Sequence, residues 1–393
     1  MHMTLLHMAI TALIVASLPL SIVWISKDVN KYRKLVWVSV FLTFDLIVFG
    51  AFTRLTDSGL GCPDWPGCYG EANPFIAHEA IKAAEALMPT GPVTVFKAWV
   101  EMIHRYLAMG IGVLIVAMMC VAWYRWRKTR AAGYQPGYPT LLFFFVCLQG
   151  AFGAWTVTLK LQPVIVTIHL LLGMGLLSLL AWFGCRQNRI TAQPVSTLGS
   201  GTRVDTSSAV RADTAESVSI SVPDPKVDTS SAVRWLALLS AAVVALQIAL
   251  GGWVSTNYAT LACSEFPLCQ GQLVPEMDFE HGFHLWRELG KTAAGHYIPF
   301  QALTAIHWVH RNFALVVVLV LGLTAWRAWR VPGLKRLAQG IVAILAIQAF
   351  TGLATIYFNF PLAIAVLHNA GAALMVLLLT MLNYRAKYAD QTQ

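Results

Sequence analysis

Four histidines fall within apolar stretches of the sequence and form two matched pairs. His104 and His169 lie in the N-terminal half of the chain, and His310 and His368 lie in the C-terminal half. Ionisable side chains are costly inside a membrane and usually mark a functional site. A structural histidine, hydrogen-bonded to a neighbouring helix, is the alternative for any single one. The repetition of the pair in both halves favours function.

Each pair has the composition of an axial ligand set for haem iron. Two imidazoles from separate helices, with no thiolate nearby, suit such ligation. Zinc prefers three or four close protein ligands, and neither pair supplies them. The sequence therefore predicts one bis-histidine haem site in each half.

Arginine follows the first histidine of each pair. Arg105 and Arg311 come directly after these histidines, and Arg54 lies at the end of another apolar stretch. A guanidinium fork binds carboxylates well, so we interpret the three arginines as partners of haem propionates. Snorkelling of the side chain toward lipid headgroups is the alternative, mainly for Arg54.

The two halves differ three residues before the first histidine, where one half has Glu101 and the other has His307. The i, i+3 spacing places each of these residues on the same helical face as its histidine. We therefore expect Glu101 to face a haem pocket as an acid, a base or a charge-stabilising group. A helix salt bridge with Arg105 at i+4 is the alternative. The other intramembrane acid, Asp45, is interpreted as structural.

Four cysteines form two pairs, each with a spacing of six, in loops. Cys62 and Cys68 lie in CPDWPGC, and Cys263 and Cys269 lie in CSEFPLC. We place both loops on the outer face, where an oxidising compartment favours the disulfides Cys62–Cys68 and Cys263–Cys269. The bonds are structural in one interpretation. In the other they are a thiol–disulfide couple that relays electrons, which requires a strained or exposed bond.

These residues must be positioned by membrane-spanning helices. The chain has 57% hydrophobic and 12% charged residues, whereas about a quarter of the residues in soluble proteins are charged. Crossing the hydrocarbon core takes roughly 20 apolar residues, and nine runs are long enough. They are residues 4–26, 35–54, 98–123, 138–158, 163–184, 235–256, 301–326, 337–357 and 361–384. The fold class is therefore an all-α, polytopic membrane protein.

The basic residues predict the orientation. Of the 28 Lys and Arg, 20 fall in segments that one topology puts on the cytoplasmic side of a bacterial-type inner membrane. In that topology the N-terminus is outside, in the periplasm, and the C-terminus is cytoplasmic. The first run lacks preceding basic residues and a cleavage site, so we expect a retained anchor. The net charge of +9 does not indicate nucleic acid binding, because the basic residues lie between apolar runs.

The chain divides into two similar halves. The stretch that begins at Gln149 resembles the stretch that begins at Gln348, and EMIHR at 101–105 matches HWVHR at 307–311. Four helices in each half restore the orientation, which predicts parallel repeats related by an axis along the membrane normal. The segment between the halves is rich in Ser, Thr, Val, Asp and Pro and has no helical periodicity, which predicts a disordered cytoplasmic linker. The expected segments are an extra helix and turn (1–34), a four-helix half (35–184), the linker (185–234), a second four-helix half (235–384) and a cytoplasmic tail (385–393).

Several motifs together resemble the haem A synthase family. They are FGAFTRLTDSGLGCPDWPGC at 49–68, EMIHR at 101–105, the histidine at 169, GHYIPFQALTAIHWVHR at 295–311 and LHNAG at 367–371. The resemblance covers both halves but neither the first span nor the linker. It implies an eight-helix core that oxidises the C8 methyl group of haem O to a formyl group by successive hydroxylations. The product, haem A, serves cytochrome oxidase assembly, and a haem O synthase supplies the substrate.

The resemblance also implies roles for individual residues. By position, His104 and His169 would ligate the substrate haem beside the catalytic carboxylate of Glu101. His310 and His368 would hold haem B as an electron-transfer group. The cysteine pair of the first loop would take part in redox relay or in haem transfer.

Two other functions fit the same residues. A di-haem membrane cytochrome that only transfers electrons would make Glu101 dispensable, and a transporter with a histidine proton relay would bind no haem. A bis-ligated iron has no open position for oxygen. Our hypothesis is therefore electron withdrawal from the macrocycle, with Glu101 stabilising positive charge or taking a proton. The electron acceptor, the source of the formyl oxygen and the formation of a homo-oligomer stay open.

Overall fold

The computed structural model describes residues 2–192 and 229–388, and this part of the chain is helical without a β-strand. Nine of the helices described there are long and apolar enough to cross a membrane. They are α1 (His2–Ile25), α2 (Lys31–Leu55), α4 (Val95–Thr129), α5 (Gly137–Thr158), α6 (Pro163–Ala192), α7 (Thr229–Thr256), α9 (Phe300–Trp329), α10 (Lys335–Tyr357) and α11 (Leu362–Tyr388). The prediction of an all-α polytopic membrane protein is confirmed.

Two of these helices begin at capping residues that the sequence supplies. The Asn30 side chain accepts a hydrogen bond from the Arg33 amide at the start of α2, and Thr94 does the same for the Lys97 amide at the start of α4. A side-chain oxygen at this position satisfies one of the free N–H groups of the first turn. The starts of the two helices that frame the first cysteine loop are therefore partly fixed by local sequence.

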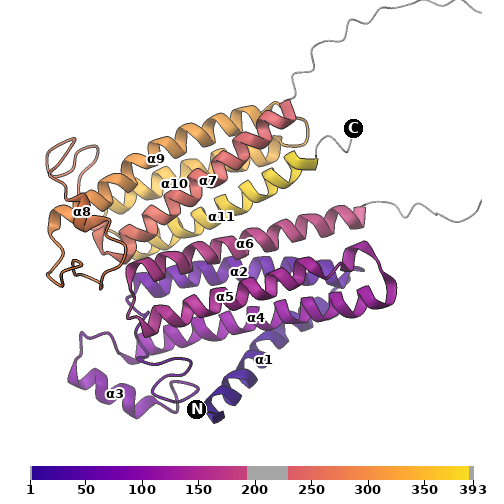
Figure 1. Cartoon of the computed structure of the whole chain (residues 1–393), viewed down its shortest axis with the longest axis horizontal. Helices are drawn as coiled ribbons and strands as arrows, with labels where there is room; N and C mark the ends of the chain where they lie inside the picture. Colours follow the sequence, from indigo (N-terminus) through magenta and orange to yellow (C-terminus); the bar gives the residue numbers. More distant parts are fainter. Residues whose placement is uncertain (1, 193–228, 389–393) are drawn as a thin grey trace, which may run out of the picture.

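Eight helices form two four-helix bundles that lie side by side (Figure 1). In the N-terminal bundle α2 contacts α4, α4 contacts α5, α5 contacts α6, and α6 closes the ring on α2. In the C-terminal bundle α7, α9, α10 and α11 contact one another in the same cyclic order. The bundles meet where α11 packs on α2 and α6 and where α6 packs on α7. The equal order of contacts supports the predicted repeat.

One core of buried apolar side chains runs through both bundles and the seam between them. A few polar contacts join helices within this core, such as the 2.7 Å hydrogen bond between the hydroxyls of Ser240 and Thr324. Asn383 of α11 likewise donates to the carbonyl of Ala237 on α7. Since lipid is as apolar as the core, such contacts and close packing hold membrane helices together.

The first helix lies outside the two rings, against α4 and α2 (Figure 1). A Cβ on Gly110 of α4 would stand 2.9 Å from the Val15 side chain, so glycine allows the close approach of α1. Near its start, Thr4 donates a hydrogen bond to the carbonyl of Gly70 in the first cysteine loop. The extra helix therefore packs on the N-terminal bundle and its loop, and the C-terminal bundle has no such neighbour in the described part of the chain.

The long loops gather at one end of the molecule (Figure 1). They contain the short helices α3 (His78–Leu87) and α8 (Phe279–Gly282), which the sequence analysis did not predict. Two 3₁₀ turns, η1 (Ala132–Tyr134) and η2 (Ala259–Leu261), complete the helical elements. The start of α1 lies at the loop end, and the end of α11 lies at the opposite one. Which end faces the periplasm stays a prediction.

Two of the predicted boundaries need correction. Helix α6 continues to Ala192 and α7 begins at Thr229, so helix occupies both ends of the segment predicted as a linker at 185–234. The polar composition of these ends misled the prediction, because helices extend beyond the hydrocarbon core into the headgroup region. The rest of that segment, 193–228, lies outside the described residues, as does 389–393 of the predicted tail.

Candidate functional site

The two predicted histidines of the N-terminal bundle each lie against a glycine of a neighbouring helix. His104 of α4 lies over Gly50 of α2, where a Cβ would stand 3.0 Å from the imidazole Cε1. His169 of α6 lies over Gly153 of α5, where the same distance would be 3.1 Å. Phe49 stacks beside the His104 ring at a centroid distance of 6.2 Å. The imidazoles are thus seated against backbone that lacks a side chain.

The C-terminal bundle repeats this arrangement. His310 of α9 lies over Gly251 of α7, and His368 of α11 lies over Gly352 of α10. A Cβ on these glycines would stand 2.9 and 3.4 Å from the imidazole Cε1. We call the four glycines under the imidazoles the glycine seats. They occur in both bundles, and the positions of the histidines in the sequence do not reveal them. A side chain would crowd the imidazole at Gly50, Gly153 and Gly251, whereas at Gly352 it would stand at an ordinary contact distance.

The Nε2 atoms of the four imidazoles are available for a ligand. None of them is hydrogen-bonded to a described residue or buried without a partner. In each bundle the two histidines come from helices that lie opposite each other in the ring of four, α4 and α6 in one and α9 and α11 in the other. In the described part of the chain no three His, Cys, Asp or Glu side chains gather where they could hold a metal ion. Two-histidine sites fit haem iron, because the porphyrin supplies the other ligands.

Glu101 links α4 to the first cysteine loop. Its Oε2 accepts a 2.8 Å hydrogen bond from the Cys62 amide, and its Oε1 pairs with the Arg105 guanidinium. Both side chains of this ion pair are buried, with exposed fractions of 5% and 9%. The salt bridge considered as the alternative is therefore present. It orients the carboxylate toward the loop, on the helix that carries His104.

His307 takes the place of Glu101 in the other half. Its Nδ1 accepts a 3.3 Å hydrogen bond from the Cys263 amide, as Glu101 does from the amide of Cys62. No ion pair forms, because an imidazole offers no carboxylate to Arg311. The two halves thus share the anchoring of the first cysteine and differ in the anchoring group.

Arg105 and Arg311 hold the backbone of the two cysteine loops. Arg105 Nη1 donates to the carbonyls of Asp64, Pro66 and Gly67 at 2.9, 3.1 and 2.5 Å. Three corresponding carbonyls accept from Arg311, at distances of 2.6 to 3.0 Å; they belong to Glu265, Pro267 and Leu268. These contacts occupy the terminal nitrogens that the sequence analysis assigned to haem propionates. The propionate role of both arginines stays a prediction.

Arg54 joins the two bundles at the loop end. Its Nη2 donates to the Ser255 carbonyl at 2.5 Å, its Nη1 pairs with Asp57 at 3.1 Å, and its guanidinium lies 4.3 Å from the centre of the Tyr258 ring. Burial raises the pKa of Tyr258 above its usual value, which keeps the hydroxyl protonated as a donor to Asp57 at 2.7 Å. Arg54 therefore lies at the seam and not inside one site.

Both loop disulfides predicted from the sequence are present. Cys62 is bonded to Cys68, and Cys263 is bonded to Cys269. All four residues are at most 1% exposed. Since thiol–disulfide exchange needs access to a sulfur atom, electron relay to an external thiol would require the loop to open. The redox role stays a prediction.

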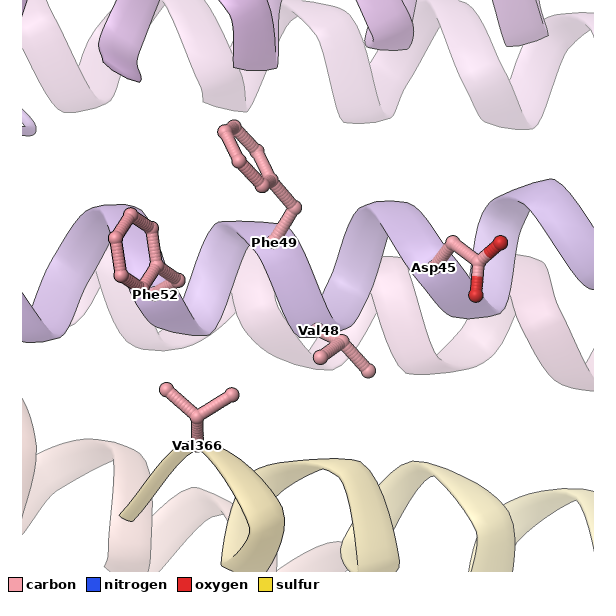
Figure 2. A pocket seen from close by; sticks show the side chains of 5 residues that line it. All are labelled: Asp45, Val48, Phe49, Phe52 and Val366. Carbon is pink, nitrogen blue, oxygen red and sulfur yellow. The ribbon is translucent and has the colours of Figure 1, made fainter. Parts of the chain in front are cut away.

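A crevice of about 380 Å³ lies where α2 meets α11 (Figure 2). It is lined by Asp45, Val48, Phe49 and Phe52 of α2 and by Val366 of α11. The carboxyl group of Asp45 is the polar group among these side chains (Figure 2). Phe49 connects the crevice to the His104 ring on which it stacks. Asp45 thus lies at the seam of the bundles, which leaves its interpretation as structural untested.

Comparison with known proteins identifies the family. A model of the COX15-CtaA family, described as cytochrome oxidase assembly protein, matches residues 33–381. The heme A synthase of Shewanella oneidensis is 36% identical over 349 residues, which cover 88% of this chain and 94% of that protein. The heme A synthase of Caulobacter sp. strain K31 is 27% identical over 381 residues, covering 89% and 94%. The chain belongs to the haem A synthase family.

The match to the haem A synthase family places every predicted site residue within its range. The match starts at residue 33, after α1, and ends at residue 381, within α11. The family resemblance inferred from the motifs is thereby confirmed. The first helix lies outside the matched range, as the sequence analysis expected.

Sequence reasoning missed the glycine seats and the polar groups around the imidazoles. Gln149 and Gln348 donate to the backbone carbonyls of His169 and His368 at 3.1 and 3.0 Å. The aligned stretches that begin at these glutamines contained the signal, because a glycine follows four residues later in each. Without the helix contacts, however, nothing tied those positions to a histidine on another helix.

Proposed function

We propose that this chain is a haem A synthase that oxidises the C8 methyl group of haem O to a formyl group. Its similarity to heme A synthases along most of its length supports the assignment. The observation that carries it is the pair of two-histidine sites seated on glycine. Their fit to haem iron and the family match point to the same chemistry.

The two sites take different parts in this proposal. His104 and His169 hold the substrate haem O, and His310 and His368 hold a haem B that passes electrons to an acceptor still to be identified. Glu101 makes the difference between the halves, because the equivalent position carries an imidazole. The substrate comes from a haem O synthase, and the product enters cytochrome oxidase.

Oxidation of a methyl group to a formyl group with water as the oxygen source releases four electrons and four protons. Bound haem O supplies the conjugated macrocycle from which the electrons leave. Glu101 lies on the helix of His104 in a buried ion pair, where a carboxylate can accept a proton or stabilise positive charge. Appearance of the formyl oxygen from labelled dioxygen, and not from labelled water, would contradict this part of the proposal.

The protein is a multi-pass membrane protein, and we place it in a bacterial-type inner membrane. The cysteine loops and the start of α1 would face the periplasm, and the end of α11 would face the cytoplasm. The two disulfides in these loops are consistent with an oxidising compartment on that side.

The test uses cells that express the full chain together with a source of haem O, followed by separation of haems B, O and A by chromatography. We expect Glu101→Gln to abolish haem A and to leave haem B bound, because the amide can still accept the Cys62 N–H. The matched control is His307→Gln in the other half, which should retain haem A. Unchanged haem A in Glu101→Gln would contradict the role of Glu101. Bound haems without any haem A in the parent chain would favour the di-haem cytochrome.

A further inference from the structure

The two bundles differ at the Nδ1 atoms of their histidines. In the N-terminal bundle, Nδ1 of His104 and Nδ1 of His169 are buried without a hydrogen-bond partner. In the C-terminal bundle, Nδ1 of His310 lies 3.2 Å from Gln247 Nε2, and Nδ1 of His368 lies 2.9 Å from the Thr351 hydroxyl. The atom opposite Nε2 thus has a partner in one bundle and none in the other.

The contact with Thr351 favours one tautomer of His368. The Thr351 hydroxyl lies 2.8 Å from the Ile347 carbonyl, one turn earlier on α10, and 3.3 Å from the Gln348 carbonyl. When the hydroxyl donates its proton to one of these carbonyls, its oxygen accepts the proton of Nδ1 of His368. With its proton on Nδ1, the imidazole presents the lone pair of Nε2 to a metal ion.

Gln247 is the corresponding hydrogen-bond partner of Nδ1 of His310. Its amide nitrogen lies 3.2 Å from both Nδ1 and the backbone carbonyl of His310, while its Oε1 is buried without a partner. Oxygen and nitrogen of an amide exchange places by rotation about one bond. Rotation brings Oε1 to Nδ1, where it accepts the Nδ1 proton of a metal-binding imidazole in exchange for the hydrogen bond from Nε2 to the His310 carbonyl.

The sequence of the N-terminal bundle excludes both contacts. Gln247 lies four residues before the glycine under His310, and Leu46 occupies the same place before the glycine under His104. Thr351 directly precedes the glycine under His368, and Phe152 directly precedes the glycine under His169. Neither Leu46 nor Phe152 has a side-chain acceptor. The absence of both contacts from the N-terminal bundle is therefore set by its sequence.

We propose that Thr351 and Gln247 are positioning residues that make the C-terminal bundle a site for a resident haem, while Leu46 and Phe152 keep the N-terminal bundle a site for an exchanging one. A hydrogen bond to the far nitrogen orients a metal-binding histidine and raises its basicity, and loss of such a partner costs about 10- to 100-fold in metal affinity. A substrate haem must leave after the reaction, whereas a redox haem must stay. This inference rests on the proposed function.

The test measures haem release from the purified full chain, loaded with haem B, into excess apomyoglobin. A His104→Ala/His169→Ala background restricts binding to the C-terminal pair. In this background we expect Thr351→Val and Gln247→Leu each to speed haem release about tenfold. They should also raise the midpoint potential, because a less basic ligand stabilises ferric iron less. Thr351→Ser should restore both values. The matched control is Thr355→Val, whose hydroxyl bonds only to the Gly352 carbonyl.

The reciprocal test adds the missing partners to the N-terminal pair. In a His310→Ala/His368→Ala background, Leu46→Gln and Phe152→Thr should slow haem release and lower the midpoint potential. Release rates and potentials of Thr351→Val and Gln247→Leu equal to those of the background would overturn the inference and leave the proposed function intact. No haem bound by the unsubstituted chain would instead overturn the proposed function.

Discussion

The two cysteine loops are held by matching contacts, but a carboxylate anchors the first loop and an imidazole anchors the second. In both, an arginine binds three loop carbonyls and a side chain three residues before the histidine accepts the amide of the first cysteine. Only the first loop places a buried carboxylate there, paired with Arg105. It also receives a hydrogen bond from Thr4 of α1. The two loops thus share one anchoring geometry and differ in the charge of the anchoring group.

The first loop has a charged anchor although the geometry of the anchor does not require a charge. The imidazole of His307 anchors its loop without a counter-ion. A buried ion pair contributes little net stability over apolar residues, but its disruption is costly. Glu101 therefore has a cost in the first half that the second half avoids, which is the pattern expected of a functional group.

The largest difference between the halves is expected when the two loop arginines, Arg105 and Arg311, are replaced by alanine. Arg105→Ala leaves the Glu101 carboxylate buried without its partner, and we expect a loss of about 3 kcal/mol in the free energy of unfolding. Arg311→Ala removes hydrogen bonds from a half-buried side chain, so water can replace them and the loss should be about 1 kcal/mol. Denaturant unfolding of both variants in detergent checks the difference. Equal losses would mean that the ion pair adds nothing to the loop anchor.

A second prediction compares two glycine seats within the C-terminal bundle. Gly251→Ala puts a Cβ 2.9 Å from the His310 ring, which must shift, whereas Gly352→Ala puts it at an ordinary 3.4 Å from the His368 ring. Displacement of a ligand should lower haem affinity about tenfold in Gly251→Ala, and Gly352→Ala should stay close to the parent. Haem content after gel filtration measures both. Similar haem contents would show that the glycine does not set the position of the ring.

The histidines, the loop cysteines and the nine spans among the described residues could be predicted because each depends on local pattern. Hydrophobic runs identify helices, and a histidine within them is conspicuous. The asymmetry of Glu101 and His307 was also visible, because the repeat aligns the two positions. Contacts between helices were not, since each joins residues that are far apart in sequence.

The arginines illustrate that limit. Their position after a histidine suggested a propionate partner, but the loop folds back over the helix and offers carbonyls at 2.5 to 3.1 Å to Arg105. The chain path of the loop decides this, and it is set by the disulfide and by the ends of α2 and α4. The Nδ1 partners of His310 and His368 were hidden for the same reason, because they come from other helices.

Removal of the two disulfides should reveal a smaller difference between the halves, measured as the loss of haem A formation. Replacing Cys62 and Cys68 by serine frees the loop that donates an amide to Glu101, so we expect haem A formation to fall several-fold. Replacing Cys263 and Cys269 loosens the loop at His307, which the proposed function does not use as a catalyst, and should cost less. Haem A per bound haem B, measured by chromatography, compares the two. Complete loss from the Cys62→Ser change alone would instead favour a redox cycle of the first disulfide.

The smallest effect is expected at Arg54. The corresponding position in the C-terminal half is Ser255, and its carbonyl accepts a hydrogen bond from Arg54. Arg54→Ala removes a partly exposed ion pair with Asp57 and a hydrogen bond across the seam. Such a pair contributes about 0.5 kcal/mol, so stability should fall little. The rate of haem release should stay within about twofold of the parent rate, because about 0.5 kcal/mol corresponds to about a twofold change in an equilibrium constant. A large acceleration with haem B, absent with its dimethyl ester, would place a propionate on Arg54. The seam would then be part of the haem site as well as the joint between two bundles.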